Sequence, residues 1–112
     1  MAAPRLNVPL KLETPVRESD GMGGFRIVWR GLGQIWAEMR SGGGTETRAE
    51  VGPQSRVGWR ITLRAAPVGD PRRPRPEQRL RMGSRLFRIN SVAESDPRGR
   101  WLICFAVEED QA

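Results

Sequence analysis

Apolar and polar residues alternate with a period of two along most of the chain, which indicates β-strands. The clearest alternation covers residues 57–65, "VGWRITLRA". It predicts a strand with one face in the core and one in solvent. The inward set is Val57, Trp59, Ile61 and Leu63, and the outward set is Gly58, Arg60, Thr62 and Arg64.

Two more alternating segments lie on either side of a glycine-rich stretch near the start of the chain. The segment 9–19 alternates loosely and reads as a first strand, which Pro15 should confine to a sheet edge or a bulge. After the glycines, Phe25, Ile27 and Trp29 share one face, and we expect them to lie in the wall of the fold.

The alternation is interrupted at residues 31–33 and then resumes through residue 40. This pattern predicts either two strands or one long strand broken by a glycine bulge. Trp36 falls on the otherwise polar face of this segment. Two interpretations of it stay open: a core residue of a two-sided strand, or an exposed anchor for a neighbouring subunit.

The rest of the chain supplies the remaining elements of the predicted fold. Two strands are expected around a turn at residues 82–84, and a final strand at 101–109 is apolar on both faces and therefore central. Thr45 would cap a short helix over residues 46–51, whereas the prolines of residues 67–78 predict an extended loop. The sum is an all-β fold: a small antiparallel β-barrel of about six to seven strands, with one short helix and long loops.

At 112 residues the chain is expected to form one domain, residues 1–112, with a flexible N-terminal arm at 1–8 and a C-terminal tail at 109–112. No apolar run is long enough to cross a membrane, and the N-terminus lacks the apolar stretch of a signal peptide. The sequence therefore predicts a soluble protein, made in the cytosol, that has no membrane partner.

Catalytic chemistry has few candidate residues in this sequence. The chain has no histidine, which removes the commonest general base and imidazole metal ligands, and its acids are scattered. Cys104, the single cysteine, stands in the apolar run "WLICFAV" and is expected to be a buried hydrophobe. We therefore expect no catalytic residue, no metal site and no cofactor.

The stretch "ESDGMGGFRIVW", residues 18–29, suggests a phosphate-binding glycine loop at first sight. Arg26 stands where a dinucleotide fingerprint needs its third glycine, a strand follows instead of a helix, and no Gly-Lys-Ser/Thr is present. A single aspartate is also too few ligands for a calcium loop. The stretch predicts a tight turn between antiparallel strands.

Positive charge is the strongest compositional signal. The net charge is +6, and of nineteen basic residues only Lys11 is a lysine, which is typical of a GC-rich genome. The excess favours contact with a polyanion, through phosphates and without base readout. The densest basic cluster, and hence the candidate contact with DNA or a neighbouring ring, is Arg72, Arg73, Arg75 and Arg79.

The order of several segments resembles the small head–tail joining proteins of long-tailed bacteriophages, of the head-closure or stopper type. These segments are "DGMGG", "WAEMR", "ETRAE", "WRITLRA", "RLRMGSRLFRINSV" and "WLICFAVEE". The similarity spans about Leu10 to Glu108, and the arginine-rich character suits a phage-like gene transfer agent. The resemblance implies a virion neck protein, assembled in the bacterial cytoplasm, without catalytic activity.

The resemblance also implies partners and a role. Such proteins form a ring between the portal or its adaptor and the tail terminator or tail tube. The ring closes the head after DNA packaging, retains the double-stranded DNA in its lumen and offers the tail a docking face. A hexamer is favoured because the protein connects to the tail, whose tube would match sixfold symmetry. A dodecamer, which would match the portal, is the alternative.

By the same resemblance, the channel-closing element is the segment from Ser41 to Ser55. Candidate closing residues are Ser41, Gly42, Gly43, Gly44, Thr45, Glu46 and Arg48. Closed rings need two different complementary patches on each subunit. Candidate subunit contacts are Trp36, Glu108 and Glu109, with the acidic C-terminal residues complementing the basic residues 72–79.

Two other functions compete with this interpretation. A small barrel that binds nucleic acid non-specifically would show DNA affinity that falls steeply with salt. An enzyme is disfavoured by the missing histidine, and only a carboxylate-dependent activity that requires Asp20 would revive it.

Overall fold

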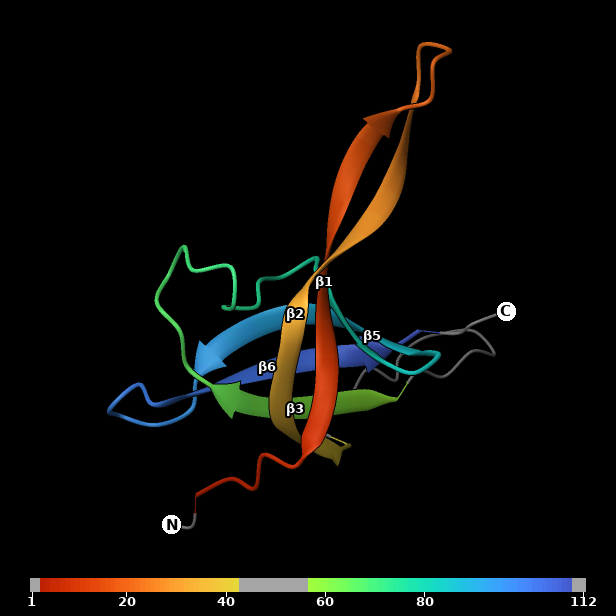
Figure 1. Cartoon of the computed structure of the whole chain (residues 1–112). Coiled ribbons are helices and arrows are strands. Elements are labelled where there is room, and N and C mark those ends of the chain that lie inside the picture. The colour runs from red at the N-terminus through yellow and green to blue at the C-terminus, as the bar shows by residue number, and fades with distance from the viewer. Residues whose placement is uncertain (1–2, 43–56, 110–112) are drawn as a thin grey trace.

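A computed structural model of the chain describes residues 3–42 and 57–109. These residues form six antiparallel strands that close into a barrel in the order β1-β2-β3-β6-β5-β4 (Figure 1). The strands are β1 (Val8–Ser19), β2 (Phe25–Ser41), β3 (Gly58–Arg64), β4 (Arg79–Met82), β5 (Arg85–Glu94) and β6 (Trp101–Glu108). The predicted all-β barrel is confirmed, and the short helix predicted at 46–51 lies outside the described residues.

Every strand contributes apolar side chains to one core inside the barrel. The core consists of Leu10, Leu12, Ala37, Ile61, Leu63, Leu80, Phe87, Ile89, Leu102, Cys104 and Ala106. The expected inward positions of β3 are confirmed at Ile61 and Leu63, and Trp59 packs edge-on against Phe87, with ring centroids 5.7 Å apart. The inward prediction for Val57 is wrong because β3 begins after it, and its side chain is 50% exposed.

The segment 25–41 is one long strand that contains a bulge, the second of the two alternatives that its sequence allowed. Leu12 pairs with Gly33, but the next residue, Glu13, pairs with Gly31, so Leu32 is the extra residue. Gly33 has a φ of 124°, a conformation that residues with a side chain rarely adopt. Gly33 therefore allows the bulge to form in a strand that is otherwise regular.

The bulge exchanges the faces of β2. Side chains alternate with an exact period of two, so one extra residue moves every later side chain to the other face. After the bulge, Ile35, Ala37 and Met39 lie against the core. Before it, Phe25 pairs with Ser19 and Ile27 with Arg17, on the face that Pro9 and Lys11 place outside the barrel.

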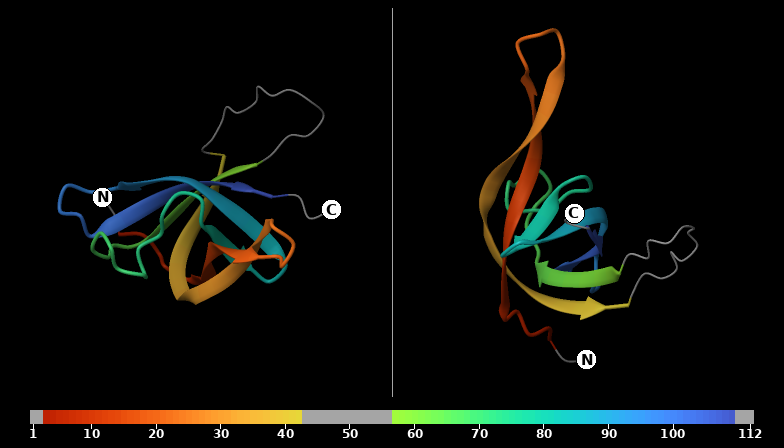
Figure 2. Two further views of the ribbon diagram at one scale, coloured as in Figure 1. Left: turned by 90° about the horizontal axis from the view of Figure 1, so that it is seen from above. Right: turned by 90° about the vertical axis from the view of Figure 1, so that its right-hand side faces the viewer.

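The first half of the β1–β2 pair leaves the barrel as a projecting hairpin, residues 14–30 (Figures 1 and 2). β4 pairs with β1 only from Lys11 to Glu13, and β3 pairs with β2 only from Ala37 to Ser41. Beyond those points β1 and β2 pair with each other and with no further strand of residues 3–42 and 57–109. The expectation that Phe25 and Ile27 lie in the barrel wall is therefore wrong: they are 62% and 53% exposed on the hairpin.

The turn at the tip of the hairpin is built by Asp20, as expected of a glycine-rich turn. Its carboxylate accepts hydrogen bonds from the backbone N–H groups of Met22 (2.7 Å) and Gly24 (3.0 Å), which lowers its pKa. Gly21 and Gly23 have positive φ angles of 81° and 89°. Pro15 lies in the hairpin, where β1 is an edge strand, as its missing N–H requires.

The final strand is central, as its composition indicated, because β6 pairs with β3 on one side and β5 on the other. Its residues Leu102, Cys104 and Ala106 point into the core. The alternate residues point outward, where they are half-buried. Within residues 3–42 and 57–109, no helix is long and apolar enough to cross a membrane.

Candidate assembly interface

The surface features that can hold another protein are spread over four places: the projecting hairpin, a network at its base, the loop 65–78 and a hollow beside Trp36. Among the described residues no group of three metal-ligating side chains comes together. Burial raises the pKa of the Cys104 thiol to about 12, so it is a core residue and not a nucleophile.

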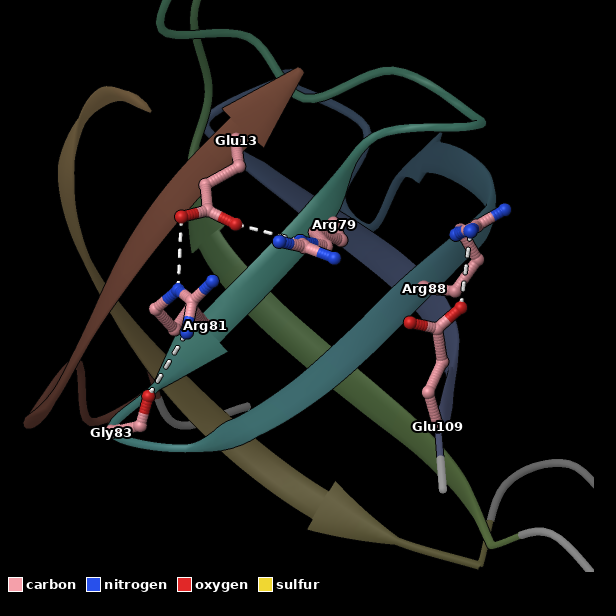
Figure 3. A network of polar contacts seen from close by, with 6 residues as sticks. All are labelled: Glu13, Arg79, Arg81, Gly83, Arg88 and Glu109. Atoms are coloured by element: carbon pink, nitrogen blue, oxygen red, sulfur yellow. Dashed lines mark hydrogen bonds and ion pairs between the residues drawn. The ribbon is translucent and has the colours of Figure 1, made fainter. Parts of the chain in front are cut away.

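A network of arginines and carboxylates ties the base of the hairpin to the barrel (Figure 3). The Glu13 carboxylate accepts from Arg79 Nε at 2.6 Å and from Arg81 Nε at 2.9 Å. Burial alone would raise the pKa of Glu13, but the hydrogen bonds from Arg81 and Arg79 outweigh it, and the pKa lies below its usual value. The Glu13 carboxylate is therefore held in its charged form.

Trp29 contacts two neighbouring arginines of the barrel, Arg79 of β4 and Arg88 of β5. The Arg79 guanidinium lies 4.0 Å from the centroid of the Trp29 ring, and that of Arg88 lies 5.3 Å from it. Arg88 in turn pairs with Glu109 at 3.1 Å (Figure 3). Cation–π contacts of this kind are worth about 1–2 kcal/mol when partly desolvated. The hairpin is thus fixed at its base, and beyond it β1 and β2 pair with no other described strand.

The arginines of the predicted DNA-contact or ring-contact cluster occupy two different environments. Arg79 belongs to β4 and its side chain is 11% exposed against Glu13. Arg73 is half-buried and donates to the Ala66 carbonyl at 3.0 Å. Only Arg72 and Arg75 are exposed, and Arg72 makes a two-pronged pair with Asp70, whose pKa it lowers to about 2.

The candidate C-terminal contact residues already have partners within the chain. Glu108 accepts two hydrogen bonds from Arg85, at 2.8 and 3.0 Å, and one from the Trp59 indole at 3.3 Å. Hydrogen bonding by Arg85 lowers the pKa of Glu108. With Glu109 paired to Arg88, the acidic charge expected to meet residues 72–79 of a neighbour is instead neutralised locally.

Trp36 points out of the barrel and is 50% exposed, so it does not fill the core. It lines a shallow hollow together with Leu6, Ile35, Pro67 and Arg72. Two candidate contact residues from distant parts of the sequence, Trp36 and Arg72, are therefore brought together. Of the predicted closing residues, Ser41 pairs with Trp59 at the end of β2, and the Gly42 N–H donates to the Gly58 carbonyl at 2.8 Å. The others, Gly43 to Arg48, lie outside the described residues.

The sequence did not single out the hairpin as a surface feature. Met22 at its tip is 87% exposed, and it shares the hairpin with the exposed Phe25 and Ile27. The signal was present in the two glycines around Leu32, whose bulge turns an apparently core-facing row outward. A closed all-β barrel with a fixed core and an exposed apolar projection has the features of an assembly component.

The comparisons with known proteins define that component. A family model described as phage head completion protein matches residues 1–109, and the chain belongs to this family. A chain in a structure titled "Virion of native gene transfer agent (GTA) particle" is 52% identical, with a TM-score of 0.82, over 98% of this chain and 100% of that one. A search of curated proteins finds no match. The protein is thus a structural virion component that acts in joining head and tail, and it is not an enzyme.

Proposed function

We propose that this protein forms a homo-oligomeric ring, a hexamer, in the neck of a gene-transfer-agent-like particle. The ring lies between the portal or adaptor and the tail terminator or tail tube, closes the head after packaging and gives the tail its docking face. The observation that carries the proposal is the 52% identity, over nearly the full length of both chains, to a protein of a native gene transfer agent virion.

The described residues on either side of residues 43–56 support the assignment of Ser41 to Ser55 as the channel-closing element. The strands on either side of it, β2 and β3, end at neighbouring positions, and the Gly42–Gly58 hydrogen bond holds those ends together. A long insertion between two adjacent strand ends costs the barrel little. The closing residues named from the sequence, Ser41 to Arg48, begin at this point of the rim.

The exposed arginines Arg72 and Arg75 support a contact with DNA or with the adaptor ring. An arginine neutralises phosphate without reading bases, which suits a lumen that holds any packaged sequence. Arg73 and Arg79 are assigned to the support of this loop and of the hairpin base, because their side chains are partly buried and bonded to groups of the chain. Arg72, although paired with Asp70, has a side chain that is 76% exposed.

Deletion of the gene in the particle-producing host tests the function. The expected result is heads that lack tails and lose their DNA to added nuclease, with both properties restored by the gene supplied in trans. Tailed particles with nuclease-resistant DNA from the deletion strain would overturn the proposal.

A filter-binding measurement separates this function from that of a nucleic-acid-binding module in the cytosol. The purified protein is expected to bind duplex DNA only weakly at moderate salt, since its contacts act collectively in the ring. Tight binding by the free protein, with a steep salt dependence, would favour the binding module instead.

A further inference from the structure

Two arginines, Arg40 and Arg60, stand next to each other on the outer surface of the barrel. They are directly opposite each other in the ladder between β2 and β3, and both are exposed. Both point away from the core, because their chain neighbours Met39 and Ile61 point toward it. Like charges directly opposite each other on one face of an antiparallel pair are destabilising. The pair therefore costs the protein stability unless an anion lies beside it.

The described residues neutralise this pair only weakly. Arg60 forms no ion pair within residues 3–42 and 57–109. Arg40 pairs with Glu38 at 3.6 Å, and its own side chain is 74% exposed. The Glu38 carboxylate also accepts a hydrogen bond from the backbone N–H of Arg5 at 3.2 Å. An exposed pair at this distance contributes little, so two cations remain open to a stronger anionic partner.

The Arg60 guanidinium also lies against an aromatic ring. Its central carbon is 5.9 Å from the centroid of the Phe105 ring, which belongs to the neighbouring strand β6. An arginine that stacks on an aromatic ring keeps its N–H donors, which lie in the guanidinium plane, for other partners. These donors match the oxygens of a phosphate group in a two-pronged contact. Arg60 is thus placed to bind a phosphate.

The pair lies at the rim of the barrel that borders residues 43–56. β2 ends one residue after Arg40, and β3 begins two residues before Arg60. In the proposed function this rim carries the channel-closing element, so it faces the lumen and the packaged DNA. The arginine-rich loop 65–78 follows the other end of β3, about 20 Å away along the strand. The two basic regions therefore serve different places in the neck.

We infer that Arg40 and Arg60 together bind a backbone phosphate of the packaged duplex DNA at this rim of the ring. The phosphate neutralises the two facing charges, and the contact reads no bases, as a lumen that receives any packaged sequence requires. The exposed loop arginines Arg72 and Arg75 then remain for the adaptor ring. The inference rests on the proposed function, because it assigns the DNA contact of the proposed ring to particular residues.

The salt dependence of DNA binding by the purified protein tests the contact. The probe is a fluorescent duplex of about 20 base pairs, titrated from low salt upward so that weak binding is measurable. Each phosphate contact that is lost lowers the slope of log K against log salt by about 0.9. Arg40→Gln/Arg60→Gln is expected to lower the slope by about that amount, and the affinity at low salt by about tenfold. An unchanged slope would overturn the inference.

A matched variant removes the same charge from the opposite rim. Arg64 lies over the Trp101 ring at 5.3 Å, as Arg60 lies over Phe105, and Arg98 belongs to the turn before β6. Arg64 and Arg98 are exposed and form no ion pair with a described carboxylate. Arg64→Gln/Arg98→Gln is expected to leave the slope nearly unchanged. Equal reductions in the two double variants would show that binding follows net charge alone and would overturn the inference.

Assembled particles show whether the pair contacts DNA or a protein. Particles with Arg40→Gln/Arg60→Gln are expected to contain this chain and carry tails, but to lose several-fold more DNA to added nuclease than particles of the matched variant. Full retention of DNA would overturn the inference. Heads without tails or without an adaptor, together with an unchanged salt slope, would assign the pair to an acidic protein surface and would also overturn it.

A failure of this inference is distinguishable from a failure of the proposed function. An unchanged salt slope and normal DNA retention in the Arg40→Gln/Arg60→Gln variant would overturn the phosphate contact alone and leave the neck function intact. Tailed particles with nuclease-resistant DNA from the deletion strain would instead overturn the function.

Discussion

The two halves of β1 and β2 have similar residue patterns but different surroundings. In the barrel half, Leu10, Leu12 and Ala37 are almost completely buried, because β3 and β4 lie on either side and close the sheet. In the hairpin half, Phe25 and Ile27 are more than half exposed, because no third strand of the described residues pairs with this part of β1 and β2. Burial of a strand residue is thus decided by the neighbouring strands and not by its own hydrophobicity.

The largest expected effect is a difference in stability between a variant in the barrel core and a variant in the hairpin. Phe87→Ala removes the largest fully buried side chain of the core and is expected to destabilise the fold by roughly 3–5 kcal/mol. Phe25→Ala on the hairpin is expected to change stability by less than about 0.5 kcal/mol. Urea unfolding of the two variants at neutral pH measures the difference. Comparable losses would show that the hairpin belongs to the cooperative core of the isolated protein.

The next effect concerns the joint between the halves. Glu13→Gln leaves the guanidinium groups of Arg79 and Arg81 without their carboxylate, and removing one partner of a buried pair costs about 3 kcal/mol. The matched variant Glu108→Gln, which breaks a more exposed pair with Arg85, is expected to cost about 1 kcal/mol or less. Equal costs, by urea unfolding, would contradict the difference in burial between the two sites.

Low pH is expected to weaken the ion pairs of Glu13 at the base of the hairpin. The folded-state pKa of Glu13 lies below the ordinary value of 4.5, so its contribution to stability is complete above pH 4.5 and is lost as the pH falls through the lower folded value. Glu108 and Asp70 act in the same direction, Asp70 last, since its pKa is about 2. We expect stability to fall from pH 5 to pH 3, and to fall less steeply in Glu13→Gln. An unchanged slope in that variant would exclude Glu13 as a contributor.

The smallest effect is local to the hairpin tip. Asp20→Ala removes the acceptor of the Met22 and Gly24 amides. These amides are expected to exchange faster with deuterium, while global stability changes by less than about 0.5 kcal/mol, because no residue of the tip belongs to the described core cluster or packs against it. Faster exchange throughout β6 would contradict the separation of tip and barrel.

The sequence predicted much of the barrel, because its strands carry the period-two pattern that one buried face imposes. Ile61 and Leu63 of β3 and the central position of β6 followed from that pattern. The outward direction of Phe25 and Ile27 did not, because a bulge of one residue leaves the composition of a strand unchanged while it exchanges the faces.

The candidate site was less predictable for a related reason. Arg79 and Arg72 are equivalent in a sequence, but Arg79 is paired with Glu13, which is 66 residues away, and Arg72 lies on an exposed loop. Such partners depend on which strands become neighbours, and the barrel closure between β1 and β4 is a long-range contact. The exposed face of Trp36 depends on the same closure.

The bulge at Leu32 also makes the surface of the projecting hairpin easy to change in evolution. If a substitution at Gly33 that excludes its φ of 124° made the ladder regular with every residue retained, the inner residues after the bulge would stay in place. The hairpin part of β2 would then shift its pairing with β1 by one residue. Arg26, Val28 and Arg30 would then stand where Phe25, Ile27 and Trp29 now stand. A single substitution would then replace an apolar surface of the hairpin by a basic one. The bulge is therefore a point at which a particle component can change its partner without a change in its barrel.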